Sequence, residues 1–188
     1  MSFAERRRFL WVLFLIGLAV LAVVANSTTL AHMSLEELAH HATAIARVRC
    51  TGTQSKWQDG EIWTETRFQV VEQTKGILPA TVTVQMIGGT VGHLTSHVEG
   101  VPTFRAGEEA YLFLWTREGE PYRVLAWSQG TFRIARNPRT GAETVTQDSA
   151  AASLFDPGTK QFRHGGIRSL PVEAFQSKLR EALQQKTP

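Results

Sequence analysis

The sequence predicts a mainly β fold: a small, OB-like, partly open antiparallel barrel with one flanking helix at each end. Residues 62–70 alternate apolar and polar, and a turn then leads into a second strand. Residues 109–115 are apolar on both faces, as in a central strand that is covered on both sides. About six to eight short strands are separated by glycine-containing turns. A β-sandwich is the alternative architecture.

The N-terminus has the layout of a secretory signal. Arg6, Arg7 and Arg8 precede an uncharged apolar run over residues 9–25, and small residues follow. Cleavage after Ala25 or after Ala31 fits this pattern. An uncleaved anchor is the alternative, in which residues 9–25 would be the chain's only contact with the membrane. Both alternatives place the domain outside the cytoplasm, periplasmic or extracellular, with residues 1–31 as signal peptide or membrane anchor.

A β-barrel domain with a leading helix is predicted over residues 32–147. Ser34 and Glu37 have the spacing of a capping box, and the apolar positions after them suit about two helical turns. In the strand over residues 62–70, Phe68 shares the inner face and Trp63 lies on the opposite face. Val82, Val84 and Met86 are predicted to face inward from the next strand.

Glycine-rich residues 88–107 are predicted to form a long loop, either functional or crossing between sheets. Short strands follow in residues 122–127, 131–134 and 142–146. Residues 148–168 are predicted to be an extended linker on the surface. A C-terminal helix is expected over residues 169–186, with Ser169 as its N-cap, Pro171 in its first turn and an apolar stripe that includes Phe175 and Leu179.

Composition excludes a nucleic-acid-binding surface. The 188 residues include 20 Lys and Arg and 17 Asp and Glu, of which the first 31 residues hold three and one. The remainder therefore carries 17 basic and 16 acidic side chains, a net charge of +1, which gives no basic patch for nucleic acid. Cys50 is the single cysteine, so no internal disulfide forms, and its strand context predicts a buried apolar side chain.

No motif predicts catalysis or a cofactor. The chain has no G-x-S-x-G or S-x-x-K sequence and no cysteine–histidine arrangement near a helix start. His93 and His97 resemble half a zinc site, but in an extended segment they would lie about 13 Å apart, too far to share one ion. They remain weak candidate metal ligands. The cofactor prediction is none.

The best candidates for a contact surface are the 88–107 segment and the outward face of the strand that carries Trp63. A tryptophan on a polar strand face suggests contact with protein or sugar, and cover by a helix or loop is the alternative. The candidate residues are Trp63, Gly89, Gly92 and Phe104.

Three sequence segments carry a resemblance: TRFQVVEQTKGILPATVTVQMIGGTVG, VPTFRAGEEAYLFLW and YRVLAWSQGTFRI, within residues 44–135. Together they resemble a group of uncharacterised exported bacterial proteins with a lysine–glycine turn, a GGxxG segment, a GEEalLFL strand and a QGxF strand. The resemblance implies export and a β-barrel, and no activity. A more distant similarity is to netrin-like and tissue-inhibitor OB barrels, which use an N-terminal cysteine and several disulfides, whereas this chain has only Cys50.

These observations favour an exported, non-enzymatic β-domain that acts as a protein-interaction module of the cell envelope. Its partner would be another envelope protein. One alternative is a metal-dependent hydrolase that uses the His93/His97 loop. The other is a carbohydrate-binding or structural envelope domain, which requires an exposed Trp57 or Trp63.

Overall fold

The computed structural model describes residues 31–185. The predicted leader, with its apolar run over residues 9–25, lies outside this range. Among the described residues, no helix is both long enough and apolar enough to cross a membrane.

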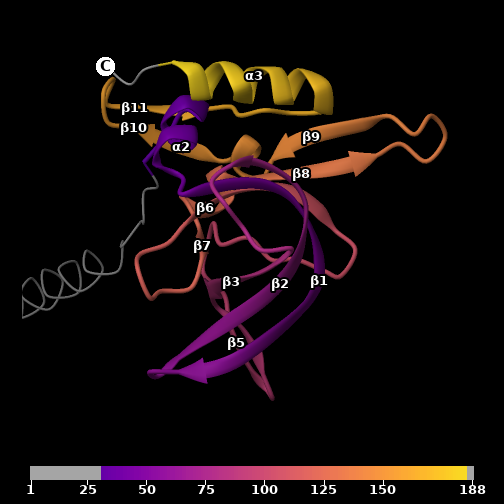
Figure 1. The fold of residues 1–188 in the computed structure, drawn as a ribbon. Helices are drawn as coiled ribbons and strands as arrows, with labels where there is room; N and C mark the ends of the chain where they lie inside the picture. Colours follow the sequence, from indigo (N-terminus) through magenta and orange to yellow (C-terminus); the bar gives the residue numbers. More distant parts are fainter. Residues whose placement is uncertain (1–30, 186–188) are drawn as a thin grey trace, which may run out of the picture. The chain divides into compact units, whose positions relative to one another are not determined.

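The fold is mainly β and is dominated by one large antiparallel sheet (Figure 1). Its strand order is β12-β9-β8-β6-β1-β2-β3, and β7 pairs with β6 beside β8. The strands are β1 (Ala44–Gln58), β2 (Glu61–Lys75), β3 (Thr81–Ile87), β6 (Glu109–Trp115), β7 (Arg123–Val124), β8 (Thr131–Arg136), β9 (Glu143–Gln147) and β12 (Leu170–Pro171).

The strand ladders of residues 31–185 form no closed barrel. The outer edge of β3 makes one isolated parallel bridge, between Val84 and Tyr122 just before β7. The Gln85 N–H donates to the Tyr122 carbonyl across this bridge at 2.8 Å. The sheet therefore curls until its β3 edge touches the segment that leads into β7.

The faces of β2 and β3 follow the alternation in the sequence. Ile62, Thr66 and Phe68 are buried, whereas Arg67 and Gln69 are exposed. On β3, the inward prediction for Val82, Val84 and Met86 is confirmed, because all three side chains are buried. The alternation holds because successive strand side chains point to opposite faces.

Strand β6 separates two hydrophobic cores, which confirms the prediction of a central strand covered on both faces. Ala110, Leu112 and Leu114 contribute to the core that β1, β2 and β3 enclose. Tyr111 and Phe113 belong to a second core with the helices. All five side chains are at most 1% exposed.

Two helices cover the second core (Figure 1). Helix α2 (Leu35–His41) begins at Ser34, and the predicted capping box with Glu37 is present. At its other end, the Lys75 ammonium donates to the carbonyls of Ala39 and His40, both at 2.8 Å. These bonds place a cation where the helix dipole is negative.

Helix α3 (Val172–Gln184) buries the predicted stripe, with Val172, Phe175, Leu179 and Ala182 in the second core. The predicted N-cap at Ser169 is wrong. Pro171 occupies the N-cap, and Ser169 lies at φ 45° before the short strand β12. The start of helix α3 is positioned by the pairing of β12 with β9 and has no side-chain cap.

Two segments predicted without strands contain hairpins. The 88–107 segment begins with β4 (Gly89–Val91) and β5 (Leu94–Ser96). The predicted linker over residues 148–168 begins with the 3₁₀ helix η2 (Asp148–Ala151). Two short antiparallel strands follow it, β10 (Ser153–Asp156) and β11 (Gln161–His164). Leu154 of β10 is buried, so this mostly polar segment packs on the domain through an apolar side chain.

Candidate binding pocket

A pocket of about 240 Å³ lies between the β1–β2 ribbon and the segment after β3. The two strands of the ribbon and β4 lie against one another at this end of the molecule. The pocket is lined by Thr53, Ser55, Thr64, Thr66, Met86, Ile87, Gly88, Gly89, Thr90, Ser96, His97, Val98, Val101, Pro102, Thr103 and Phe104.

A β-bulge in β1 creates the polar wall of this pocket. The register of β1 against β2 shifts between Cys50 and Gly52, which adds one residue to β1. Beyond this bulge, Thr53 lies opposite Thr66 and Ser55 lies opposite Thr64. A one-residue shift moves the following side chains to the other face of the sheet. The inner face therefore changes from the apolar pair Cys50–Phe68 to a group of hydroxyls.

Hydrogen bonds hold part of this hydroxyl group in place. The Ser55 and Thr64 hydroxyls lie 2.8 Å apart, and the Thr64 hydroxyl donates to the Gly88 carbonyl at 2.6 Å. Thr66 differs, because it is 0% exposed and its hydroxyl has no hydrogen-bond partner among residues 31–185. Buried hydroxyls are usually paired, so an unpaired one on a pocket wall suggests a role.

Two of the predicted contact residues are glycines of the β4–β5 hairpin. Gly89 has φ 129°, and a Cβ there would lie 2.2 Å from the Thr64 hydroxyl and 2.4 Å from the Ser55 hydroxyl. Only glycine permits this close approach of β4 to the ribbon. Gly92, with φ 61°, forms the turn between β4 and β5 and faces open space.

The other two predicted contact residues are covered by other parts of the domain. Phe104 is only 7% exposed, and its ring packs edge to face on Phe68 with 5.0 Å between centroids. It therefore belongs to the first core, and the small part of it that is exposed lines the pocket. Trp63 lies on the outward face as predicted, but the Arg123 guanidinium stacks 5.2 Å from its ring centre. The same guanidinium lies 5.8 Å from Trp115, so it fills the space between two indoles.

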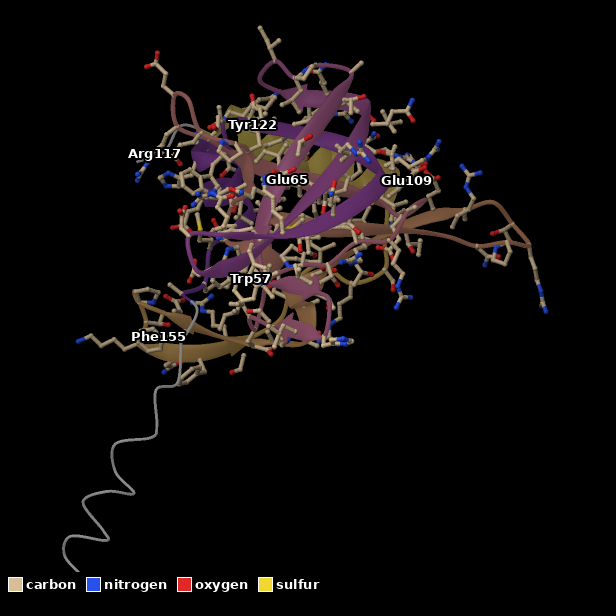
Figure 2. The ribbon with its side chains drawn as sticks, turned by 90° about the horizontal axis from the view of Figure 1, so that it is seen from below. Trp57, Glu65, Glu109, Arg117, Tyr122 and Phe155 are labelled. Carbon is tan, nitrogen blue, oxygen red and sulfur yellow. The ribbon has the colours of Figure 1, made fainter. Side chains whose placement is uncertain are left out.

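Trp57 is the tryptophan that this end of the molecule exposes. It is 52% exposed and lies near the C-terminal end of β1, where it pairs with Ile62. Its side chain is labelled in Figure 2. Trp57 follows Thr53 and Ser55 at alternate positions, so it continues the same face of the ribbon. Sequence patterns do not favour Trp57 over Trp63, because the exposure of each indole depends on whether a distant arginine covers it.

The two candidate histidines are not brought into a metal site. His93 lies in the β4–β5 turn and His97 follows β5, with 73% of its side chain exposed. The His97 imidazole lies 3.6 Å from the Glu99 carboxylate, which is itself 93% exposed. Among the described residues, no group of three or more His, Cys, Asp or Glu side chains could hold a metal ion.

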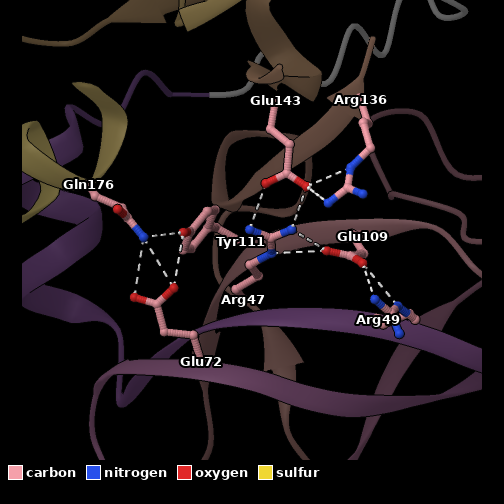
Figure 3. Close-up of polar contacts among 8 residues, drawn as sticks. All are labelled: Arg47, Arg49, Glu72, Glu109, Tyr111, Arg136, Glu143 and Gln176. Atoms are coloured by element: carbon pink, nitrogen blue, oxygen red, sulfur yellow. Dashed lines mark hydrogen bonds and ion pairs between the residues drawn. The ribbon is translucent and has the colours of Figure 1, made fainter. Parts of the chain in front are cut away.

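An ion-pair network lies at the other end of the sheet (Figure 3). Arg47 of β1 donates to Glu109 of β6 and to Glu143 of β9, with shortest distances of 2.6 Å and 2.9 Å. Arg49 completes the pairing of Glu109, and Arg136 that of Glu143. The network therefore connects strands β1, β6, β8 and β9 through fully paired charges.

The charges within this network shift one another's pKa values. The hydrogen bond to Glu143 raises the pKa of Arg47, which keeps the guanidinium charged. Hydrogen bonds from Arg47 and then Arg136 lower the pKa of Glu143. Burial acts to raise the pKa of Glu109, but hydrogen bonds from Arg49 and Arg47 outweigh it, and the net shift is downward. Each carboxylate is thus held in its ionised form.

A second polar contact joins helix α3 to the sheet (Figure 3). The Gln176 amide donates to the Tyr111 hydroxyl at 3.0 Å and to the Glu72 carboxylate at 3.1 Å. Burial raises the pKa of Tyr111. This contact satisfies the phenol of an otherwise buried ring and links helix α3 to the sheet.

Cys50 is 1% exposed within the first core, which confirms its prediction as a buried apolar side chain. Burial raises the pKa of its thiol, so the thiolate is disfavoured.

Comparison with known protein families, with curated proteins and with solved structures gives no match to this chain. The site geometry therefore carries the functional inference.

Proposed function

We propose that this protein is an exported, non-enzymatic interaction module of the cell envelope. Its contact surface would be the free end of the β1–β2 ribbon together with the β4–β5 hairpin. The observation that carries the proposal is the exposure of Trp57 at the end of this ribbon, 52% of the residue. Tryptophan is enriched in the energetically dominant positions of protein interfaces, where it buries a large area on binding.

Neighbouring features support a contact at this end. Leu94 of the β4–β5 hairpin is 59% exposed, which adds a second large apolar side chain. Strand β6 pairs with residues 44–49 of β1, and within residues 31–185 the remainder of β1, from Thr51 to Gln58, pairs with β2 alone. An unpaired strand edge can accept an extended segment of another protein through backbone hydrogen bonds. The partner class is therefore an envelope protein with an extended segment.

Export and membership of the exported bacterial group remain part of this proposal. The basic residues and apolar run at the N-terminus support export, and the lysine–glycine turn and GGxxG segment support the group. A periplasmic or extracellular location, with or without an N-terminal anchor, follows from the same leader.

We further propose an OB-like, partly open barrel formed by strands β1, β2, β3, β7 and β6. The pairing order and the parallel bridge between Val84 and Tyr122 support this description. Strands β8 and β9 would then extend β6 into a second layer, on which the flanking helices pack.

The test is site-specific crosslinking in whole cells. A photo-crosslinking amino acid replaces Trp57, and in a matched control it replaces Ile77, which is 92% exposed and follows the opposite end of β2. We expect one dominant envelope protein to crosslink at position 57 and not at position 77, identified by mass spectrometry that also reads the mature N-terminus. A domain that crosslinks at 77 only, or at neither position, would overturn the proposal.

A further inference from the structure

We propose that the pocket beside the ribbon binds a small uncharged ligand rich in hydroxyl groups, such as a single neutral sugar. Trp57 is not among the pocket's lining residues, whereas Gly89, Thr90 and Ser96 of the β4–β5 hairpin are, so the pocket adjoins the proposed protein contact without including its tryptophan. Binding of a small ligand in this pocket would be a function additional to the proposed protein contact.

Thr66 is the first observation that supports a ligand. Its residue is 0% exposed, it lines the pocket, and its hydroxyl has no partner within residues 31–185. A buried hydroxyl without a partner destabilises the fold relative to a methyl group of the same size. A ligand hydroxyl that pairs with Thr66 would remove this penalty only when it is bound.

The neighbouring hydroxyls are already oriented. Ser55 and Thr64 are hydrogen-bonded to each other at 2.8 Å, and Thr64 is fixed on the Gly88 carbonyl at 2.6 Å. The backbone of Gly89 also lies close to both hydroxyls, since a Cβ there would lie within 2.4 Å of each. Polar groups that are held in place before binding lose little conformational entropy when a ligand arrives.

The pocket wall carries no acidic or basic side chain other than a histidine, which favours an uncharged ligand. None of its lining residues is Asp, Glu, Lys or Arg. His97 is the one titratable residue among them, and its side chain is 73% exposed. A charged ligand would lose its hydration here without gaining a paired opposite charge, which is costly. An uncharged ligand avoids this cost.

The pocket lining also includes apolar side chains. Met86, Val101, Pro102 and Phe104 supply carbon surface in the same pocket as the hydroxyls of the ribbon, and Met86 is the β3 neighbour of Thr64. A sugar ring combines hydroxyl groups at its edge with an apolar face of C–H groups. The volume of about 240 Å³ suits one such ring.

Ligand-observed NMR on the full-length protein tests this proposal with four probes. D-glucose and N-acetyl-D-glucosamine are the neutral sugars, and D-glucuronate and D-glucosamine are charged counterparts. We expect saturation transfer to a neutral sugar and none, or far less, to its charged counterpart. Absence of transfer to both neutral sugars, or equal transfer to the charged ones, would overturn the proposal.

Matched variants locate the site. Thr66→Val should weaken the binding of the neutral sugar about tenfold, the effect of one lost hydrogen bond. Thr66→Ser keeps the hydroxyl and should bind as the wild type does. Thr83→Val makes the same change on an exposed position of β3 and should have no effect.

Protein stability provides the second measurement. Thr66→Val should melt at the same temperature as the wild type or higher, because it removes an unpaired buried hydroxyl. Thr66→Val that binds the sugar as tightly as the wild type would refute the assignment. Loss of the Trp57 crosslink would leave these binding results unchanged, so the two proposals fail separately.

Discussion

The two halves of strand β1 have different surroundings although they form one continuous strand. From Ala44 to Arg49 it pairs on both edges, with β2 and β6, and its side chains enter both hydrophobic cores. From Thr51 to Gln58, β2 is its one partner strand within residues 31–185, and its inward side chains are hydroxyls followed by Trp57. The register shift after Cys50 separates the two halves.

This difference shows how one ribbon can serve as both scaffold and binding surface. The first half is stabilised by burial of apolar area and by a network of paired charges. The second half has little apolar burial and an unpaired edge, features that favour recognition over stability. Substitutions in the two halves should therefore separate loss of stability from loss of binding.

The largest loss of stability is expected in the second core, to which the first half of β1 contributes Ile45. Phe175 of helix α3 lies in this core. Its ring is 0% exposed and lies 5.0 Å from both the Tyr111 and the Phe132 ring. Phe175→Ala should lower the free energy of unfolding by about 3–5 kcal/mol, because it leaves a cavity between these rings. Urea denaturation measures this loss. Ile77→Ala, at a position 92% exposed, should change stability by less than about 0.5 kcal/mol.

An intermediate effect is expected from Arg47. Arg47→Met should cost about 1–3 kcal/mol, because Glu109 and Glu143 each lose a partner in a mostly buried network. Arg49→Met removes a half-exposed partner of Glu109 and should cost less than about 1 kcal/mol. Equal losses from the two variants would contradict a central role for Arg47.

The same network predicts an acid-dependent loss of stability. The pKa values of Glu109 and Glu143 are lower in the folded protein than the ordinary 4.5. The stabilisation is therefore complete above that value and declines as the pH falls through the folded pKa values. Denaturation midpoints measured at decreasing pH should fall for the wild type and fall less steeply for Arg47→Met. Parallel pH curves for the two proteins would refute the link.

The smallest effect on stability is expected at Trp57. Trp57→Ala should change the free energy of unfolding by less than about 0.5 kcal/mol, because half of the residue is already exposed. The same variant should lose its envelope partner in co-purification from cells. A large loss of stability would instead mean that Trp57 belongs to the scaffold, and the contrast between the two halves of β1 would not hold.

The sequence predicted the features that depend on local patterns. The alternation in β2 and β3, the doubly apolar strand β6, the capping box at Ser34 and the stripe of α3 all follow from residue spacing within one element. Such spacing is readable because side-chain direction repeats every two residues in a strand and every 3.6 in a helix.

The pocket could not be predicted in the same way. It depends on the extra residue in β1 at the register shift, which has no distinct signature in a strand of mixed polarity. The burial of Phe104 and the cover of Trp63 depend on Phe68 and Arg123, which are distant in the sequence. The hairpin over residues 153–164 was missed because its polar composition resembles that of a linker.

Residue spacing was enough to predict the central strands, the inward faces of β2 and β3, and the apolar stripe of α3. Which aromatic residue remains exposed and where the hydroxyl-lined pocket forms depend on how distant segments pack. The direction of a side chain within a strand is local. Its exposure depends on which distant segment packs over it, and that is settled by the packing of the whole domain.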